Sequence, residues 1–124
     1  MTEKEVKVLK LEEVENFKAL GGTLKRMFNP ETAGTENMTF SVGYFPPGEG
    51  LQSHLHPESE EVYYVVRGIG EVYLGKEKTP MSIEPDMAIY IPSGVIHGVK
   101  NTGEKRLIIC FFVAPGMEKS EVIE

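Results

Sequence analysis

The feature that most limits the fold is the placement of glycine and proline, which divides the chain into short stretches. Thirteen glycines and eight prolines are spread along 124 residues, and the segments between them are rich in Val, Ile, Tyr and Phe. Short strands joined by tight turns are typical of all-β sandwiches and barrels. The sequence therefore predicts an all-β domain with strands near residues 6–9, 23–28, 39–45, 61–67, 70–74, 80–84, 87–91, 95–100 and 107–113.

Two segments depart from this pattern. In residues 10–20, KLEEVENFKAL, Leu11, Val14, Phe17 and Leu20 share one helical stripe, so a short helix is expected there. A strand followed by a turn fits the same residues equally well. The last residues, MEKSEVIE, are charged and are expected to be loosely held.

Charge and composition exclude several classes of protein. The net charge is -6 and no run of Lys and Arg occurs, which argues against a nucleic-acid partner. The N-terminal residues alternate charged with aliphatic side chains, so neither a signal peptide nor a membrane span is expected. Cys110 is the only cysteine and lies in the apolar run LIICFFV, which predicts a buried, unreactive thiol and a cytoplasmic protein.

The segment 107–113 is apolar at successive positions, so both of its faces should be covered. A strand with one face in water would alternate between apolar and polar residues. In a domain of this size the second cover is either another subunit or the N-terminal segment folding back over the strand.

Two of the three histidines, His54 and His56, are two residues apart, which places both side chains on one face of an extended chain. Gln52 has the same parity. If the turn PESE brings the next strand alongside, Glu61 converges on the two imidazoles. Imidazole and carboxylate ligands of this kind suit Zn, Fe, Mn, Ni or Co.

The third histidine, His97, lies in another expected strand with Val95 and Val99 as neighbours on the same face. A single histidine on an apolar face is most often a core residue bonded to the backbone. Glu60 and Glu61 alone would most often be a solvated pair of charges. The pairing of His54 with His56 favours a metal site instead.

Residues 48–101 resemble the two signature motifs of the cupin superfamily. The first motif is matched by Gly48, His54, His56, Glu61 and Gly68, and the second by Pro92, Gly94, His97 and Asn101. The second motif usually opens with a glycine, and here that position is Asp86. The family's glycine tolerates a turn with positive φ, and Asp is among the better substitutes at such a position.

The resemblance implies a small single-domain cupin over residues 1–124, with a β-barrel or jelly roll (double-stranded β-helix). The barrel is expected over about residues 39–115, preceded by N-terminal strands or an arm over 1–38 and followed by a tail over 116–124. It also implies that one divalent metal ion per subunit is bound by His54, His56, Glu61 and His97, without distinguishing Mn, Fe, Zn, Ni and Co. The glycines, Pro92 and Asn101 are expected to hold turns.

Four protein ligands leave open positions on a metal that accepts six, which is a catalytic rather than a closed structural arrangement. We therefore expect a metal-dependent enzyme acting on a small oxygenated organic molecule: a dioxygenase, decarboxylase, lyase or isomerase. The alternatives are a module that binds a sugar or organic acid without chemistry, and a metal that only stabilises the fold. A homodimer is expected, with neither nucleic acid nor a membrane as partner.

Several residues near the motifs are candidates for the pocket. Tyr63 shares a face with Glu61 and could donate to a substrate oxygen or transfer a proton, so it is the candidate catalytic residue. Gln52, Tyr44 and Tyr90 are further pocket candidates, and core packing is the ordinary interpretation for each tyrosine. Two arginines could bind an anionic substrate or be solvated charges at strand ends: Arg26 and Arg67.

Overall fold

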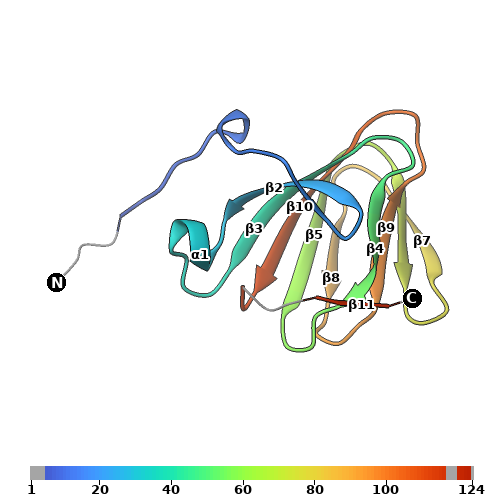
Figure 1. Ribbon diagram of the computed structural model, residues 1–124. Helices are drawn as coiled ribbons and strands as arrows, with labels where there is room; N and C mark the ends of the chain where they lie inside the picture. The colour runs from blue at the N-terminus through green and yellow to red at the C-terminus, as the bar shows by residue number, and fades with distance from the viewer. Residues whose placement is uncertain (1–4, 117–119, 124) are drawn as a thin grey trace.

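The computed structural model describes residues 5–116 and 120–123, which form two antiparallel sheets facing each other (Figure 1). One sheet has the strand order β1-β2-β3-β10-β5-β8 and the other the order β11-β4-β9-β6-β7. The strands of the first sheet are β1 (Phe17–Ala19), β2 (Gly22–Phe28), β3 (Thr39–Phe45), β10 (Leu107–Ala114), β5 (Glu60–Arg67) and β8 (Ala88–Ile91). Those of the second are β11 (Glu121–Val122), β4 (Gly50–Leu55), β9 (His97–Asn101), β6 (Gly70–Leu74) and β7 (Thr79–Ile83).

The all-β fold class is confirmed, and eight of the nine expected strands are present with ends shifted by at most two residues. The strand expected at 6–9 is wrong, because residues 5–10 have no regular secondary structure and pair with no strand. In Figure 1 this segment runs away from the sheets. β4 was expected only as an extended segment carrying the histidines, β1 corresponds to the strand-and-turn alternative for residues 10–20, and β11 was not expected.

The helix expected over residues 10–20 is also wrong, and the strand-and-turn alternative is the one that forms. Only a single 3-10 turn, η1 (Leu11–Glu13), is helical there, and β1 follows it. The chain reverses at Leu20 and Gly21, which have φ of 54° and 86°, values that glycine tolerates best. The hairpin reaches the second sheet, where the amide of Gln52 donates to the carbonyl of Leu20 at 2.8 Å.

The C-terminal tail is held more firmly than its charge suggested. β11 pairs with β4, with Glu121 opposite Leu55 and Val122 opposite His54. Backbone hydrogen bonds supply this pairing, so it does not depend on apolar side chains. The prediction of a loose tail is therefore wrong for residues 120–123, and residues 117–119 and 124 lie outside the described part of the chain.

The core lies between the two sheets, and buried residues alternate with more exposed ones along β5 and most of β10. Tyr63 and Val65 of β5 and Ile109 of β10 have no exposed surface, and neither does Val72 of the facing sheet. Burying a side chain of this size contributes roughly 1.5–3 kcal/mol relative to leaving it in water. This interior fixes the positions of the strands that carry the histidines and Glu61.

The outer face of the six-stranded sheet is only partly covered. Phe112 lies opposite Val62, which lies opposite Tyr90, so these side chains form one row across three strands. Phe112 is 38 % exposed and Tyr90 is 60 % exposed. Cys110, also on this face, is half-buried rather than buried as expected, and its burial still raises the pKa of the thiol.

The N-terminal segment does not provide the missing cover. Val6 and Val8 are 93 % and 82 % exposed, so neither residue is buried against the sheet. The segment reaches the sheet only further along, where Nζ of Lys25 donates to the carbonyl of Leu11 at 2.9 Å. Of the two covers considered for the strand at 107–113, residues 5–10 are excluded in a single subunit.

A short helix, α1 (Pro30–Ala33), follows β2 and begins at Asn29, whose side chain accepts from the amide of Thr32 at 2.7 Å. It is far too short to cross a membrane, and no helix in residues 5–116 or 120–123 has the length and apolarity to do so. Asn101 closes the far end of β9, because its side-chain amide donates to the carbonyls of Phe45 and Lys105 at 2.7 and 2.8 Å.

Candidate metal centre

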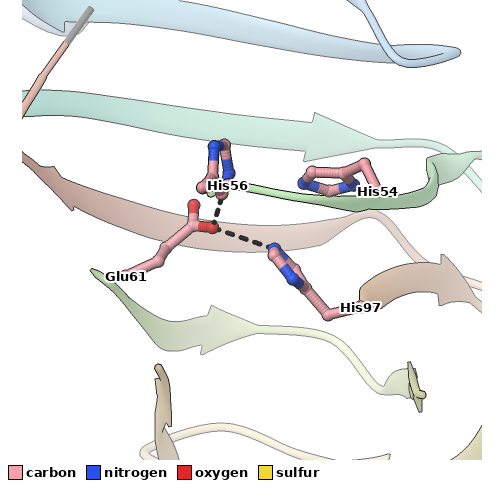
Figure 2. A group of neighbouring side chains, drawn as sticks. All are labelled: His54, His56, Glu61 and His97. Atoms are coloured by element: carbon pink, nitrogen blue, oxygen red, sulfur yellow. Dashed lines mark hydrogen bonds and ion pairs between the residues drawn. The ribbon is translucent and has the colours of Figure 1, made fainter. Parts of the chain in front are cut away.

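Three strands bring the histidines and Glu61 together between the two sheets (Figure 2). His54 is in β4 and His56 directly follows that strand, Glu61 is in β5, and His97 is the first residue of β9. Potential ligand atoms of the four side chains all lie within 4.8 Å of one another. All four residues are buried, with exposed fractions of 2 %, 8 %, 5 % and 1 % for His54, His56, Glu61 and His97.

A β-bulge sets the direction of the histidines in β4. The register between β4 and β9 shifts between Leu51 and His54, so these two residues face inward although they are three positions apart. Gln52 consequently lies on the exposed side of the strand. Beyond the bulge, His54 and His56 keep the spacing of two that points both side chains inward, as the extended chain requires.

Backbone carbonyls fix which imidazole nitrogen faces the centre. Nδ1 of His54 lies 2.7 Å from the carbonyl oxygen of Gln52, and Nδ1 of His97 lies 2.9 Å from that of Val95. A carbonyl oxygen only accepts, so each Nδ1 carries the proton and donates it. The lone pair of each Nε2 is then left for the centre, which is the arrangement that metal-ligating histidines use.

The contact between His97 and Glu61 shows that the centre needs a positive charge. Nε2 of His97 lies 3.0 Å from Oε1 of Glu61, and Nε2 of His56 lies 3.3 Å from the same oxygen. If Nδ1 of His97 holds the ring proton, Nε2 and the carboxylate are two acceptors in contact. They require either a second proton on the ring or a cation between them, and bonds of about 2.0–2.2 Å to one ion suit groups this closely spaced. The residues therefore fit a metal.

The electrostatics of the centre keep its ligands in metal-binding form. Burial, together with the nearby His97, lowers the pKa of His54 to about 4, so this imidazole is neutral at physiological pH. Burial alone would raise the pKa of Glu61. The hydrogen bonds with His56 and His97 outweigh that effect, and the net pKa of the carboxyl is lowered. A neutral imidazole and an ionised carboxylate are the forms that bind a divalent ion.

His54, His56 and Glu61 of the cluster line a cavity of about 400 Å³, a size suited to a small organic ligand. Much of the rest of the wall is apolar and comes from the first sheet and the β1–β2 hairpin. Polar groups at the wall include Ser41 and Ser120, and Oγ of Ser120 lies 3.5 Å from Nδ1 of His56. A larger hollow of about 980 Å³, beside residues 33–38, shares no residue with this wall.

Three expected pocket residues do not line this cavity. Gln52 lies in a separate hollow beside Gly50 and Lys100, because the bulge turns its side chain outward. Tyr44 and Tyr90 have the outward parity of their strands. The hydroxyl of Tyr90 donates to Glu60 at 2.7 Å on the protein surface.

Tyr63 lies close to the cluster but beneath it. Its ring centroid is 5.9 Å from that of His97 and 4.6 Å from that of Phe111, and the residue has no exposed surface. Its hydroxyl is buried with no hydrogen-bond partner among the described residues. Burial and the neighbouring Glu61 raise the pKa of Tyr63 well above its ordinary value, so the phenol stays protonated.

Sequence reasoning missed most of the cavity wall. Phe17, Leu24 and Ser41 face the cavity, and Arg26, considered only as a possible clamp, faces it as well. Alternation along β2 was the available signal, since Leu24 and Arg26 share one face of the strand and Thr23 and Lys25 share the other. Nothing in the sequence indicated which of the two faces would be the inner one.

Comparisons with known proteins agree with the fold. A profile of the Cupin domain matches residues 41–113. Protein SchB of Streptomyces halstedii is 31% identical over 93% of this chain and 82% of its own length. Polyketide synthase CurC of Streptomyces cyaneus is 32% identical over 88% of this chain and 70% of its own length.

Solved structures show the same fold at lower identity. The polyketide cyclase RemF from Streptomyces resistomycificus superimposes with a TM-score of 0.82 at 18% identity, over 97% of this chain and 87% of that one. A predicted oxalate decarboxylase from Thermotoga maritima gives a TM-score of 0.76 at 20% identity, over 88% of this chain and 99% of that one. With the domain match covering more than half of its residues, this chain belongs to the cupin family.

Proposed function

We propose that this protein is a metal-dependent enzyme that acts on a small oxygenated organic molecule. His54, His56, Glu61 and His97 hold one divalent ion per subunit, and the first three of these residues line the 400 Å³ cavity. The observation that carries the proposal is the 3.0 Å contact between Nε2 of His97 and the carboxylate of Glu61, which a cation bound by both groups accounts for. Such an ion supplies Lewis acidity to a substrate oxygen.

The relatives favour a class of reaction. Among them are a polyketide cyclase and a predicted oxalate decarboxylase. These names favour decarboxylase, lyase or isomerase chemistry over dioxygenase chemistry. Three imidazoles and one carboxylate suit Mn, Fe, Co, Ni and Zn alike, so the ligand set leaves the choice of metal to experiment.

The protein's own groups have limited roles in proton transfer. Apart from Arg26, the titratable side chains at the cavity wall all belong to the cluster, so the described wall contains no separate general base. Tyr63 is proposed as a hydrogen-bond donor to the ligand from beneath the cluster, because its hydroxyl has no partner among the described residues. Its raised pKa makes it a donor rather than a base at neutral pH.

The lack of a separate base also favours a second function, in which the protein binds an organic acid without converting it. The two are separated by preparing the metal-free protein and adding Mn, Fe, Co, Ni or Zn in turn. Metal stoichiometry is measured by elemental analysis. Acetoacetate, oxaloacetate and oxalate are then followed by NMR in D₂O for decarboxylation and for exchange of hydrogen next to the carbonyl.

We expect one metal form to bind one ion per chain and to accelerate one of these reactions. The variant His56→Ala should lose both the ion and the reaction, whereas Tyr90→Phe, on the outer surface, should keep both. Turnover that survives without metal would contradict the enzyme proposal. A compound that binds tightly and is recovered unchanged would support the binding function instead.

We also propose a homodimer, formed by the outer face of the six-stranded sheet. The row Phe112, Val62 and Tyr90 crosses three strands of this face, and residues 5–10 leave it uncovered. In a two-fold dimer this face packs against the same face of a second copy, so each residue meets its symmetry mate or a neighbour of it. Sedimentation of the wild type and of Phe112→Lys tests this: the wild type should be a dimer and the variant a monomer.

A further inference from the structure

We infer that Arg26 binds a carboxylate on the far end of the substrate while the metal-ligand cluster holds the substrate's oxygen atoms at the near end. The inference rests on the proposed function, because it assumes that the cluster binds the ion. It adds the chemical class of the substrate: an organic acid with an apolar body, bearing carbonyl, hydroxyl or carboxyl oxygens opposite its carboxylate.

The strand register places Arg26 across the cavity from the cluster. Arg26 in β2 lies opposite Ser41 in β3, Ser41 lies opposite Phe111 in β10, and Phe111 lies opposite Tyr63 in β5. This row is adjacent to the one that contains Glu61, two residues along β5. Three strand spacings of about 4.8 Å separate the backbones of β2 and β5 by about 14 Å. Arg26 and Glu61 both line the cavity of about 400 Å³, a volume suited to a short organic molecule held between the two ends.

Arg26 is exposed and lines the same cavity as His54, His56 and Glu61. No carboxylate in residues 5–116 or 120–123 forms an ion pair with it. Its guanidinium carbon lies 4.4 Å above the ring centroid of Phe17 in β1. A cation over an aromatic face is attracted by the ring, so Phe17 positions the guanidinium without neutralising it.

The charges at the cavity wall favour an anion. Among the described residues of this wall Glu61 is the single carboxylate, and a divalent ion together with Arg26 outweighs it. The cavity would thus be positive although the chain as a whole carries a net charge of -6. Guanidinium groups bind carboxylates through paired, charge-assisted hydrogen bonds, which gives such a contact both strength and direction.

The wall between the two ends selects for an apolar body. Leu24 and Phe111 line it, with Leu20 and Leu51 beside the hairpin. A sugar would leave its hydroxyl groups without partners against these side chains, at a cost of roughly 1–3 kcal/mol for each unmatched group. A keto acid or aromatic acid would bury hydrocarbon there instead, which favours binding.

The test uses probes that attach to the metal at one end and carry the charge at the other. Monohydroxamates of the linear dicarboxylic acids, from malonic to adipic, present a hydroxamate to the metal and a carboxylate at increasing distance. Their methyl esters are neutral controls of nearly equal shape. Dissociation constants are measured by calorimetry on the protein loaded with Ni or Zn, so the readout is independent of turnover.

For one chain length, we expect the wild type to bind the acid roughly tenfold more tightly than its ester, a difference of about 1.4 kcal/mol. Arg26→Gln should lose this preference and Arg26→Lys should retain part of it. Arg67→Gln is the matched control, because Arg67 is an exposed arginine at the end of β5 outside the cavity, and it should keep the full preference. Phe17→Leu should lower the preference for the acid over the ester, because it removes the ring that positions the guanidinium.

Two failures are distinguishable. If no hydroxamate binds in a metal-dependent way, the proposed metal site fails and the inference fails with it. If acid and ester bind the metal-loaded wild type equally at every chain length, the metal site stands and the role of Arg26 is refuted. An acid preference that persists in Arg26→Gln refutes it as well, since another group would then hold the carboxylate.

Discussion

His97 and Glu61 face each other across the centre with Nε2 and Oε1 3.0 Å apart, while the other nitrogen of His97 is committed to the carbonyl of Val95. The imidazole is therefore placed between two acceptors. In a buried site with a carboxylate that is 5 % exposed, this pair requires a proton or a cation. A variant that removes the charge of Glu61 removes the need for this proton or cation.

Glu61→Gln should strongly weaken metal binding while preserving the fold. The amide can donate a hydrogen bond to Nε2 of His97, so the metal-free variant should be at least as stable as the metal-free wild type. Loss of a charged ligand should weaken metal affinity by roughly a hundredfold or more, because replacing a residue that only hydrogen-bonds to a ligand already weakens it by about 10–100-fold. Calorimetric titration with Zn or Mn measures the change.

Glu60→Gln provides the matched control for that experiment. Glu60 is the preceding residue, is exposed, and accepts a hydrogen bond from Tyr90 on the outer surface. Its replacement should leave metal affinity unchanged. Equal affinity in the wild type and Glu61→Gln would show that the carboxylate is not a ligand.

Acid should destabilise the metal-free protein through His54. The pKa of His54 is about 4 in the folded protein and near 6.5 in an unfolded chain, so the unfolded state binds more protons between these values. The contribution is fully present above pH 6.5 and is lost as the pH falls toward 4, up to about 3 kcal/mol. The lowered pKa of Glu61 acts in the same direction at lower pH.

Urea denaturation with a chelator present, at several pH values from 7 to 4, measures this effect. His54→Asn is the comparison variant, because the amide can still donate to the carbonyl of Gln52 but does not titrate. The free energy of unfolding should fall less steeply with acidification in the variant. Parallel curves would show that His54 is not held neutral by the fold.

Tyr63→Phe should leave the stability of the metal-free protein unchanged or raise it by about 1 kcal/mol, because it removes a buried hydroxyl that has no partner in residues 5–116 and 120–123. Tyr63→Ala should instead cost about 3–5 kcal/mol by opening a cavity in the core. Urea denaturation compares the two. If Tyr63→Phe is destabilised by several kcal/mol, the hydroxyl has a structural bond, and its proposed role as a donor to the ligand is excluded.

The sequence allowed the cluster to be anticipated far better than the cavity around it, for physical reasons. His54, His56 and Glu61 are brought together by strand parity and one turn, which are local rules. The wall depends on which face of β2 and β3 turns inward, and that is decided by packing between sheets. The bulge before His54 illustrates the limit, because one extra residue reverses the side on which Gln52 lies.

Asp86 gives a last prediction, at the position where the related motif has glycine. Its φ is 69°, in the left-handed region, and its carboxylate accepts from the hydroxyl of Tyr64 at 2.8 Å. Asp86→Ala should lower the free energy of unfolding by about 1–2 kcal/mol. Alanine is strained in this conformation and cannot form the hydrogen bonds by which the aspartate side chain stabilises it. Asp86→Gly removes the strain along with that hydrogen bond, so its stability should lie close to that of the wild type. If alanine were tolerated as well as glycine in thermal or urea denaturation, the turn would not require a positive φ in solution.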